Sequence, residues 1–323
     1  MNNLHLLRRR DDFVDELKSF RPKFEEENIL DFLASAIKDF RTTLVLGSGV
    51  SSSVGLPLWK ELLINLVDKL CSELDNSENL AVSLKKMIDN ASPAVMARYI
   101  ENIAITKSGL TENIRECLYT KYDESKESIL LTPLVQLLVT PGDAVRISNV
   151  LTYNFDNSLE RCLKRHGVSY RSIHSAKQYA GKEMGLRIFH PHGFLPHPSD
   201  DLDNSFLDDS NIFSERGYNT LFMDIPHWAN TLQLHHFTTR RCILVGLSMV
   251  DPSMRRLLEF AKNQGNRNEA HHVTVQCAKP DMIFNALFEK DMSSLGVRVL
   301  WVEHLERMTG VLQKLQAKLG GTP

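Results

Sequence analysis

Several marks of metal-binding, membrane and exported proteins are missing from the sequence. The five cysteines of this 323-residue chain lie far apart, and no two of them form a C-x-x-C pair. This spacing argues against a zinc knuckle and favours a reducing compartment, where thiols stay free. No apolar run approaches the roughly 18 uninterrupted residues that a membrane helix needs, and the charged N-terminus lacks the apolar stretch of a signal peptide. We therefore expect a cytoplasmic protein that does not insert into a membrane.

An excess of charge of one sign is also missing. The 38 basic and 40 acidic residues leave a formal net charge of -2. No global field therefore attracts nucleic acid or an anionic membrane, and we expect no direct contact with nucleic acid. Hydrophobic residues make up 42% of the chain, which is ordinary for a globular protein of one large domain or two modest ones.

What the chain does contain is a glycine-rich stretch at residues 42–58, which reads TTLVLGSGVSSSVGLPL. A short apolar run ends at Gly47-Ser48-Gly49, and Gly55-Leu56-Pro57 precedes a helical pattern. A strand, a glycine turn and a helix in this order aim unpaired backbone N–H groups at a phosphate. Gly47 and Gly49 would allow a close approach of the backbone to a ligand. Glycine turns also join strands to helices where no ligand binds, so this stretch alone does not establish a nucleotide site.

Hydrophobic periodicity predicts an α/β fold around this stretch. Helical patterns cover residues 11–20 and 28–40, and the chain between residues 58 and 140 reads as almost wholly helical. Strands and helices alternate from residue 145 onward, which predicts a Rossmann-like parallel sheet with helices on both faces. The domains that we expect are N-terminal helices at 1–41, a sheet domain at 42–305 with a large inserted helical subdomain at 58–140, and a C-terminal helix at 306–323.

Three further polar motifs follow predicted strands. They are T-Y-N-F-D at residues 152–156, H-P-H-G at 190–193 and V-G-L-S at 245–248. Ligands of open parallel sheets bind at the carboxyl ends of the strands. We therefore expect these motifs and the glycine-rich stretch to share one site.

In their order along the chain, the four motifs resemble the sirtuin superfamily. That superfamily carries a GAG…GIP loop, a TQN-x-D strand end, a catalytic HG and a later G-T/S-S turn. The resemblance spans roughly residues 42–305 and implies that this region is an NAD-binding domain. Two departures stand out: residues 194–240 contain no cysteine, so the four-cysteine zinc module of protein-deacylating sirtuins is missing, and Leu58-Trp59-Lys60 stands where those enzymes have Asp-Phe-Arg.

The zinc-free combination with a large helical insertion is similar to bacterial sirtuin-like effectors of anti-phage systems. The resemblance implies an NAD+ hydrolase that cleaves NAD+ to nicotinamide and ADP-ribose, with NAD+ as its substrate and no metal. An unregulated enzyme of this kind would kill its host. We therefore expect a gated resting state and, as partners, further copies of the chain or a sensor protein from the same operon.

Chemistry and resemblance together assign a role to each motif. Asn154 would position the attacking water or a ribose hydroxyl, and His192 has the ordinary imidazole pKa that suits a general base. The catalytic residues that we expect are therefore Asn154 and His192. The expected NAD+-binding residues are Gly47, Ser48, Gly49 and Val50 for the pyrophosphate, Pro57 of the same loop, Asp156 for the nicotinamide amide, Gly246 and Ser248 for the ribose and phosphates, and Gln276 for the adenosine half.

Plainer interpretations stay open at several of these positions. Asn154 and Asp156 could form an Asx turn that caps the next helix. His190, His192 and His197 could form a metal cluster, because alternate strand residues share a face. The function has two alternatives as well: an NAD-dependent protein deacylase, and a sensor that binds NAD+ or ADP-ribose without cleaving it.

Overall fold

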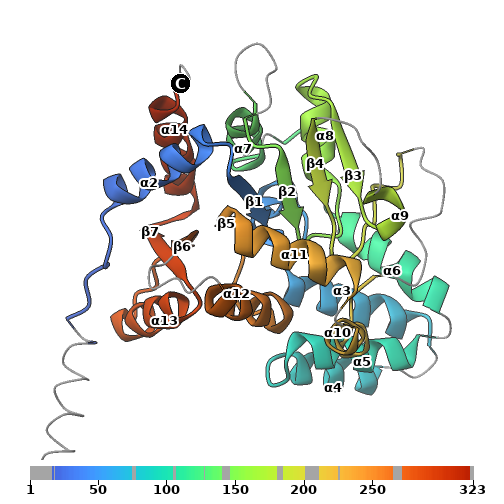
Figure 1. The fold of residues 1–323 in the computed structure, drawn as a ribbon. Coiled ribbons are helices and arrows are strands. Elements are labelled where there is room, and N and C mark those ends of the chain that lie inside the picture. Colours follow the sequence, from blue (N-terminus) through green and yellow to red (C-terminus); the bar gives the residue numbers. More distant parts are fainter. Residues whose placement is uncertain are drawn as a thin grey trace, which may run out of the picture.

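The architecture is a parallel β-sheet between two layers of helices, with a separate group of helices at one end (Figure 1). The computed structural model describes residues 17, 19–74, 78–104, 107–126, 128–139, 146–179, 185–200, 211–224, 226–264 and 271–320. Most of the helix predicted at residues 11–20 lies outside these ranges. Within them, no helix combines the length and the apolar character that crossing a bilayer requires.

All seven strands of the described sheet run parallel, in the order β3-β4-β2-β1-β5-β6-β7. The fold class predicted from the alternation of strands and helices is therefore confirmed. The strands are β1 (Thr42–Leu46), β2 (Asn149–Thr152), β3 (Tyr170–Ile173), β4 (Leu186–Phe189), β5 (Arg241–Val245), β6 (His272–Cys277) and β7 (Val297–Val302).

Each central strand contributes side chains to both helical layers, because neighbouring residues of a strand point to opposite faces. Leu44 and Leu46 of β1 belong to one buried cluster, whereas Val45 between them belongs to another. All five residues of β1 are buried, which explains why this strand reads as a continuous apolar run.

Different helices cover the two faces. The first face packs against α2 (Glu26–Lys38), α7 (Leu131–Leu138), α8 (Ser158–Arg165) and α14 (Leu305–Lys318). The second packs against α11 (Trp228–Thr239), α12 (Pro252–Gln264) and α13 (Met282–Ser294). The short helix α9 (Ala176–Tyr179) contacts the edge strand β3.

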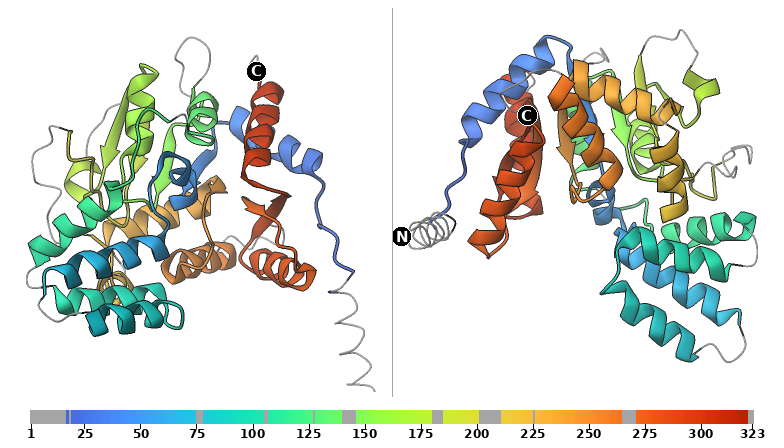
Figure 2. Two further views of the ribbon diagram at one scale, coloured as in Figure 1. Left: turned by 180° about the vertical axis from the view of Figure 1, so that it is seen from behind. Right: turned by 60° about the horizontal axis from the view of Figure 1, so that its bottom comes forward.

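A third buried cluster forms the group of helices that Figure 2 shows projecting beyond the sheet. It is built from α3 (Trp59–Ser72), α4 (Glu78–Ile88), α5 (Pro93–Ile103) and α6 (Lys107–Tyr119), and α10 (Glu215–Met223) packs against α5. Ser92 caps α5 by accepting the Val95 N–H at 3.4 Å, ahead of Pro93 in the first turn. The division of the chain at residues 41, 58, 140 and 305 stays a prediction.

Two glycine turns meet at the point where the strand order reverses. The chain leaves β1 toward β2 on one side and later returns to β5 on the other, so the turns after β1 and β5 are neighbours. Their backbones touch: the Gly47 N–H donates to the Val245 carbonyl at 3.0 Å, and the Gly49 N–H donates to the Gly246 carbonyl at 3.0 Å. Ligands of open α/β sheets bind in the crevice at this reversal.

This close approach depends on glycine at position 246. Its φ is +70°, and a Cβ there would lie 2.7 Å from the Val50 nitrogen. Gly167 has the same φ of +70°, but a Cβ there would meet nothing within 4 Å. A substitution at Gly167 therefore tests backbone strain alone, whereas one at Gly246 tests backbone strain together with lack of space for a Cβ.

We expect Gly246→Ala to lower the free energy of unfolding far more than Gly167→Ala. The left-handed backbone alone costs about 1–2 kcal/mol for a residue with a Cβ, and overpacking adds about 1–3 kcal/mol at residue 246. Urea unfolding of both variants beside the wild type measures the difference. Equal losses of unfolding free energy in the two variants would show that the turns after β1 and β5 can move apart without cost.

Candidate active site

The carboxyl ends of β1, β2, β4 and β5 bring the predicted catalytic residues to one edge of the sheet. β2 pairs with both β1 and β4, so the segments that follow these strands emerge side by side. Asn154 follows β2, and His192 follows β4. The ring of Tyr153, next to Asn154, lies 4.8 Å from the ring of His192 in an edge-on contact.

Asn154 holds the end of β2 against the glycine turn. Its side-chain nitrogen donates to the Gly47 carbonyl at 3.1 Å and to the Ser51 hydroxyl at 3.2 Å. The Asn154 Oδ1 atom makes no hydrogen bond within the described part of the chain. A carbonyl oxygen in that position is suited to accept a hydrogen bond from water or from a ribose hydroxyl.

Asp156 forms the local turn that the plainer interpretation allows. Its Oδ1 accepts the Ser158 N–H at 2.9 Å at the start of α8, and it also accepts the Ser158 and Ser51 hydroxyls. Burial raises the pKa of the Asp156 carboxyl, and the hydrogen bonds from Ser158 oppose that rise. The contact with nicotinamide that the resemblance implies stays a prediction.

His192 lies in an aromatic enclosure and is only 4% exposed. The Tyr153 and Tyr218 rings pack edge-on against the imidazole, with ring centroids 4.8 and 5.4 Å away. The imidazole Nε2 is buried and makes no hydrogen bond within the described residues. Burial lowers the pKa of His192, while the Asp251 carboxylate acts in the opposite direction. The ring is therefore neutral near pH 7, as a general base must be.

The other two histidines considered for a metal cluster have separate partners. His190 is fully buried, and its two ring nitrogens lie 3.2 Å from the Asn154 carbonyl and 2.8 Å from Glu160 Oε1. His197 Nδ1 lies 2.8 Å from the Ser199 hydroxyl. Across the described ranges, no three His, Cys, Asp or Glu side chains are arranged as metal ligands.

The amides of the first glycine turn are largely engaged within the protein. Three of the four predicted to bind pyrophosphate already donate to backbone carbonyls: those of Gly47, Gly49 and Val50. The Ser48 amide has no such partner among the described residues. Ser48 is also half-buried, whereas Gly47 and Val50 are buried. In this state the turn presents one amide to a phosphate instead of four.

The remaining predicted residues surround the second turn and the end of the first. Ser248 is exposed, next to Gly246 in the turn after β5. The Gln276 side-chain amide donates to the Leu247 carbonyl at 2.9 Å and supports this turn from β6. Pro57 is buried just before α3. Gly246, Ser248 and Gln276 therefore lie together at the turn that follows β5.

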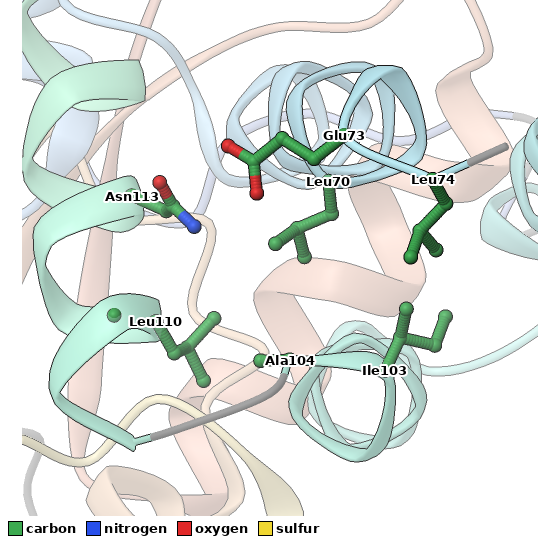
Figure 3. Close-up of a pocket in the computed structure, with 8 residues that line it drawn as sticks. Leu70, Glu73, Leu74, Ile103, Ala104, Leu110 and Asn113 are labelled. Atoms are coloured by element: carbon green, nitrogen blue, oxygen red, sulfur yellow. The ribbon is translucent and has the colours of Figure 1, made fainter.

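A cavity of about 320 Å³ lies away from these strand ends, among α3, α5 and α6. Figure 3 shows Leu70, Leu74, Ile103 and Leu110 around it, with the polar side chains of Glu73 and Asn113. None of the predicted site residues lines this cavity. The candidate active site is instead closed, with Asn154 8% and His192 4% exposed.

Three residues of the site were given no role from the sequence. Ser51 is one of three consecutive serines, and only its buried hydroxyl connects Asn154, Asp156 and Ser158. Tyr218 reaches His192 from α10, and Asp251 reaches it from the turn before α12. Nothing in the sequence placed Asp251 beside His192.

Comparison with known proteins supports the resemblance found from the motifs. Residues 148–295 match the family described as the SIR2-like domain. The matched region covers a little under half of the 323-residue chain. It contains Asn154, His192 and Gly246 but begins after the first glycine turn. The predicted kinship with sirtuins is therefore confirmed.

A curated relative matches over a longer stretch. The chain is 20% identical, over 307 residues, to a protein of Acinetobacter baumannii (strain 532279) named NAD(+) hydrolase ThsA. The match covers 90% of this chain and 56% of that protein, so the chain spans a little over half the length of its relative.

Ser51 and Ser53 offer a matched test of how the site is held together. We expect Ser51→Ala to lower the free energy of unfolding by about 1–3 kcal/mol, because it leaves buried polar partners unsatisfied. Ser53→Ala removes a partly buried hydroxyl that lies 3.2 Å from Ser128 and should cost less. Chemical denaturation of the two variants measures this difference; equal costs would contradict the central role given to Ser51.

Proposed function

We propose that this protein hydrolyses NAD+ to nicotinamide and ADP-ribose. One observation carries the proposal: Asn154 and His192 follow adjacent parallel strands in the region that matches the SIR2-like domain, beside the contact between two glycine turns. The relative named NAD(+) hydrolase ThsA supports the same activity. The lack of cysteine at residues 194–240 disfavours the alternative of a protein deacylase.

The residues fit the demands of this reaction. Nicotinamide is bound in NAD+ as a pyridinium, and it leaves with the electron pair of the broken C1′–N bond as a neutral molecule. No general acid is needed. Water forms the new C1′–O bond while Asn154 Oδ1 orients it and His192 accepts its proton. The proton then passes to solvent, and the balance is NAD+ plus water giving nicotinamide, ADP-ribose and a proton.

Binding of NAD+ would use both sides of the crevice. In our proposal the pyrophosphate lies at the Ser48 amide, and Gly47, Gly49 and Val50 shape the turn that presents it. Gly246, Ser248 and Gln276 would contact the ribose, phosphate and adenosine portions. Pro57 ends the loop, and Asp156 would contact the nicotinamide amide from the start of α8.

The closed site supports a gated enzyme. With His192 4% and Asn154 8% exposed, NAD+ needs a rearrangement before its C1′ can approach them. We propose that self-assembly or a sensor protein from the same operon triggers this opening during anti-phage defence. The five free thiols suit action in the cytoplasm, where NAD+ is available.

The decisive experiment follows NAD+ by HPLC with purified protein, alone and with the neighbouring operon product. We expect nicotinamide and ADP-ribose from the wild type, and at least about 100-fold less from His192→Ala and Asn154→Ala, as loss of acid–base or positioning groups predicts. His235→Ala is the matched control, because His235 is exposed on α11.

Other outcomes distinguish the alternatives. An active His192→Ala protein would remove the proposed base. Deacetylation of an acyl-lysine peptide that strictly requires NAD+ would establish the deacylase. Bound but unconsumed NAD+, with and without the operon product, would establish the sensor.

A further inference from the structure

Within the described part of the chain, His192 has one charged neighbour that the proposed reaction does not use. Asp251 Oδ2 lies 3.8 Å from His192 Nε2, the buried ring nitrogen that has no hydrogen bond within the described chain. This separation exceeds a hydrogen bond by less than 1 Å. A small rotation of either side chain would close it.

The position of Asp251 is fixed from two sides. Its Oδ1 accepts the Met254 N–H at 2.8 Å in the first turn of α12. Its Oδ2 accepts the Tyr218 hydroxyl of α10 at 2.9 Å. The preceding Met249 is buried with a φ of 61°, a strained conformation that only firm surroundings maintain. Asp251 therefore projects from a rigid turn.

Tyr218 and His192 face the same carboxylate oxygen. In the closed state the tyrosine hydroxyl occupies Oδ2, and the imidazole stands just out of reach. Because α10 carries Tyr218, a shift of α10 would free this oxygen for the imidazole. Two ion pairs join α10 to α5: Arg98 with Glu215 at 2.7 Å and Arg216 with Glu101 at 3.5 Å.

We propose that Asp251 is the positioning residue of His192. Its Oδ2 accepts the Nε2–H of the imidazole, which fixes the tautomer and leaves Nδ1 as the basic nitrogen. Tyr218 competes for Oδ2 in the closed state. The assignment rests on the proposed function for its catalytic consequence, but the charge of Asp251 acts on the imidazole across 3.8 Å without substrate.

The electrostatic reason lies in the burial of His192. When Nδ1 takes a proton from water, the ring becomes an imidazolium inside an aromatic enclosure, which burial opposes. A carboxylate at Nε2 stabilises that cation and holds the ring in orientation. Among the described residues, the titratable groups that face the imidazole are Tyr153 after β2, Tyr218 on α10 and Asp251 before α12.

Only one of these groups carries charge near neutral pH. Burial raises the pKa values of Tyr153 and Tyr218 well above the ordinary tyrosine value, so both stay neutral. Asp251 is then the group whose charge raises the pKa of His192 against the effect of burial. Removing that charge must lower the pKa of His192 further.

An NMR titration of the free protein tests this interaction directly. The spectrum of His192→Gln assigns His192 among the 12 histidines. In Asp251→Asn we expect a lower His192 pKa and a larger fraction of the neutral tautomer that carries its proton on Nδ1. The Asn side-chain oxygen can still cap α12. In Tyr218→Phe we expect the opposite shift, because Oδ2 becomes free for the imidazole.

Asp281→Asn is the matched control. Asp281 caps α13 as Asp251 caps α12, by accepting the Ile283 N–H at 2.9 Å. Within the described residues, no interaction joins Asp281 to His192. This variant should leave the pKa and tautomer of His192 unchanged. An unchanged His192 in Asp251→Asn, or an equal change in Asp281→Asn, would overturn the proposal.

Kinetics separate this proposal from the proposed function. We expect Asp251→Asn to lower kcat for NAD+ by about 10- to 100-fold with little change in KM. The acidic limb of its pH–rate profile should move to lower pH, because the base must be unprotonated and its pKa has fallen. A raised KM with unchanged kcat would refute the positioning role. A changed His192 titration in a protein that never hydrolyses NAD+ would uphold the interaction and refute the hydrolase.

Discussion

The contact between two glycine backbones determines the geometry of the candidate site. The turns after β1 and β5 approach so closely that a Cβ at Gly47 would lie 2.6 Å from the Gly246 carbonyl oxygen. This contact lies at the point where the strand order reverses. Asn154 is then held by the Gly47 carbonyl, so the same backbone that shapes the crevice also places a catalytic candidate. Loss of the contact would displace the turn after β1, which holds Asn154, and the turn after β5.

The inserted helices are joined to the site by hydrogen bonds to its backbone. Arg115 of α6 donates to the Pro196 carbonyl at 2.8 Å, and the Tyr119 hydroxyl donates to the Leu195 carbonyl at 2.8 Å. Both carbonyls belong to the segment that follows His192. A displacement of this helical group therefore moves the backbone beside the imidazole, and its ion pairs with α10 extend the same coupling to Tyr218. The fold thus links an outer surface to the closed site.

Burial and charge act against each other at this site. Enclosure by Tyr153 and Tyr218 keeps His192 neutral, which suits a base, but it also disfavours the cation that a base must become. A nearby carboxylate resolves this conflict only if it can approach the ring. In the closed arrangement Asp251 interacts with Tyr218 instead. The contacts in this closed arrangement therefore oppose proton transfer to His192.

The sequence by itself determined the parallel sheet, the strand-end motifs and the kinship with sirtuins. Continuous apolar runs and glycine turns are local patterns, so β1 and the turn at Gly47 could be predicted from neighbouring residues alone. Tertiary structure decided which of these residues meet. Ser51 and Asp251 gave no local signal for their contacts, because their partners lie on other elements: Asn154 lies 103 residues from Ser51, and Tyr218 lies 33 residues from Asp251. The engaged amides of Gly47 and Gly49 also depend on tertiary structure, because their partners are the distant carbonyls of Val245 and Gly246.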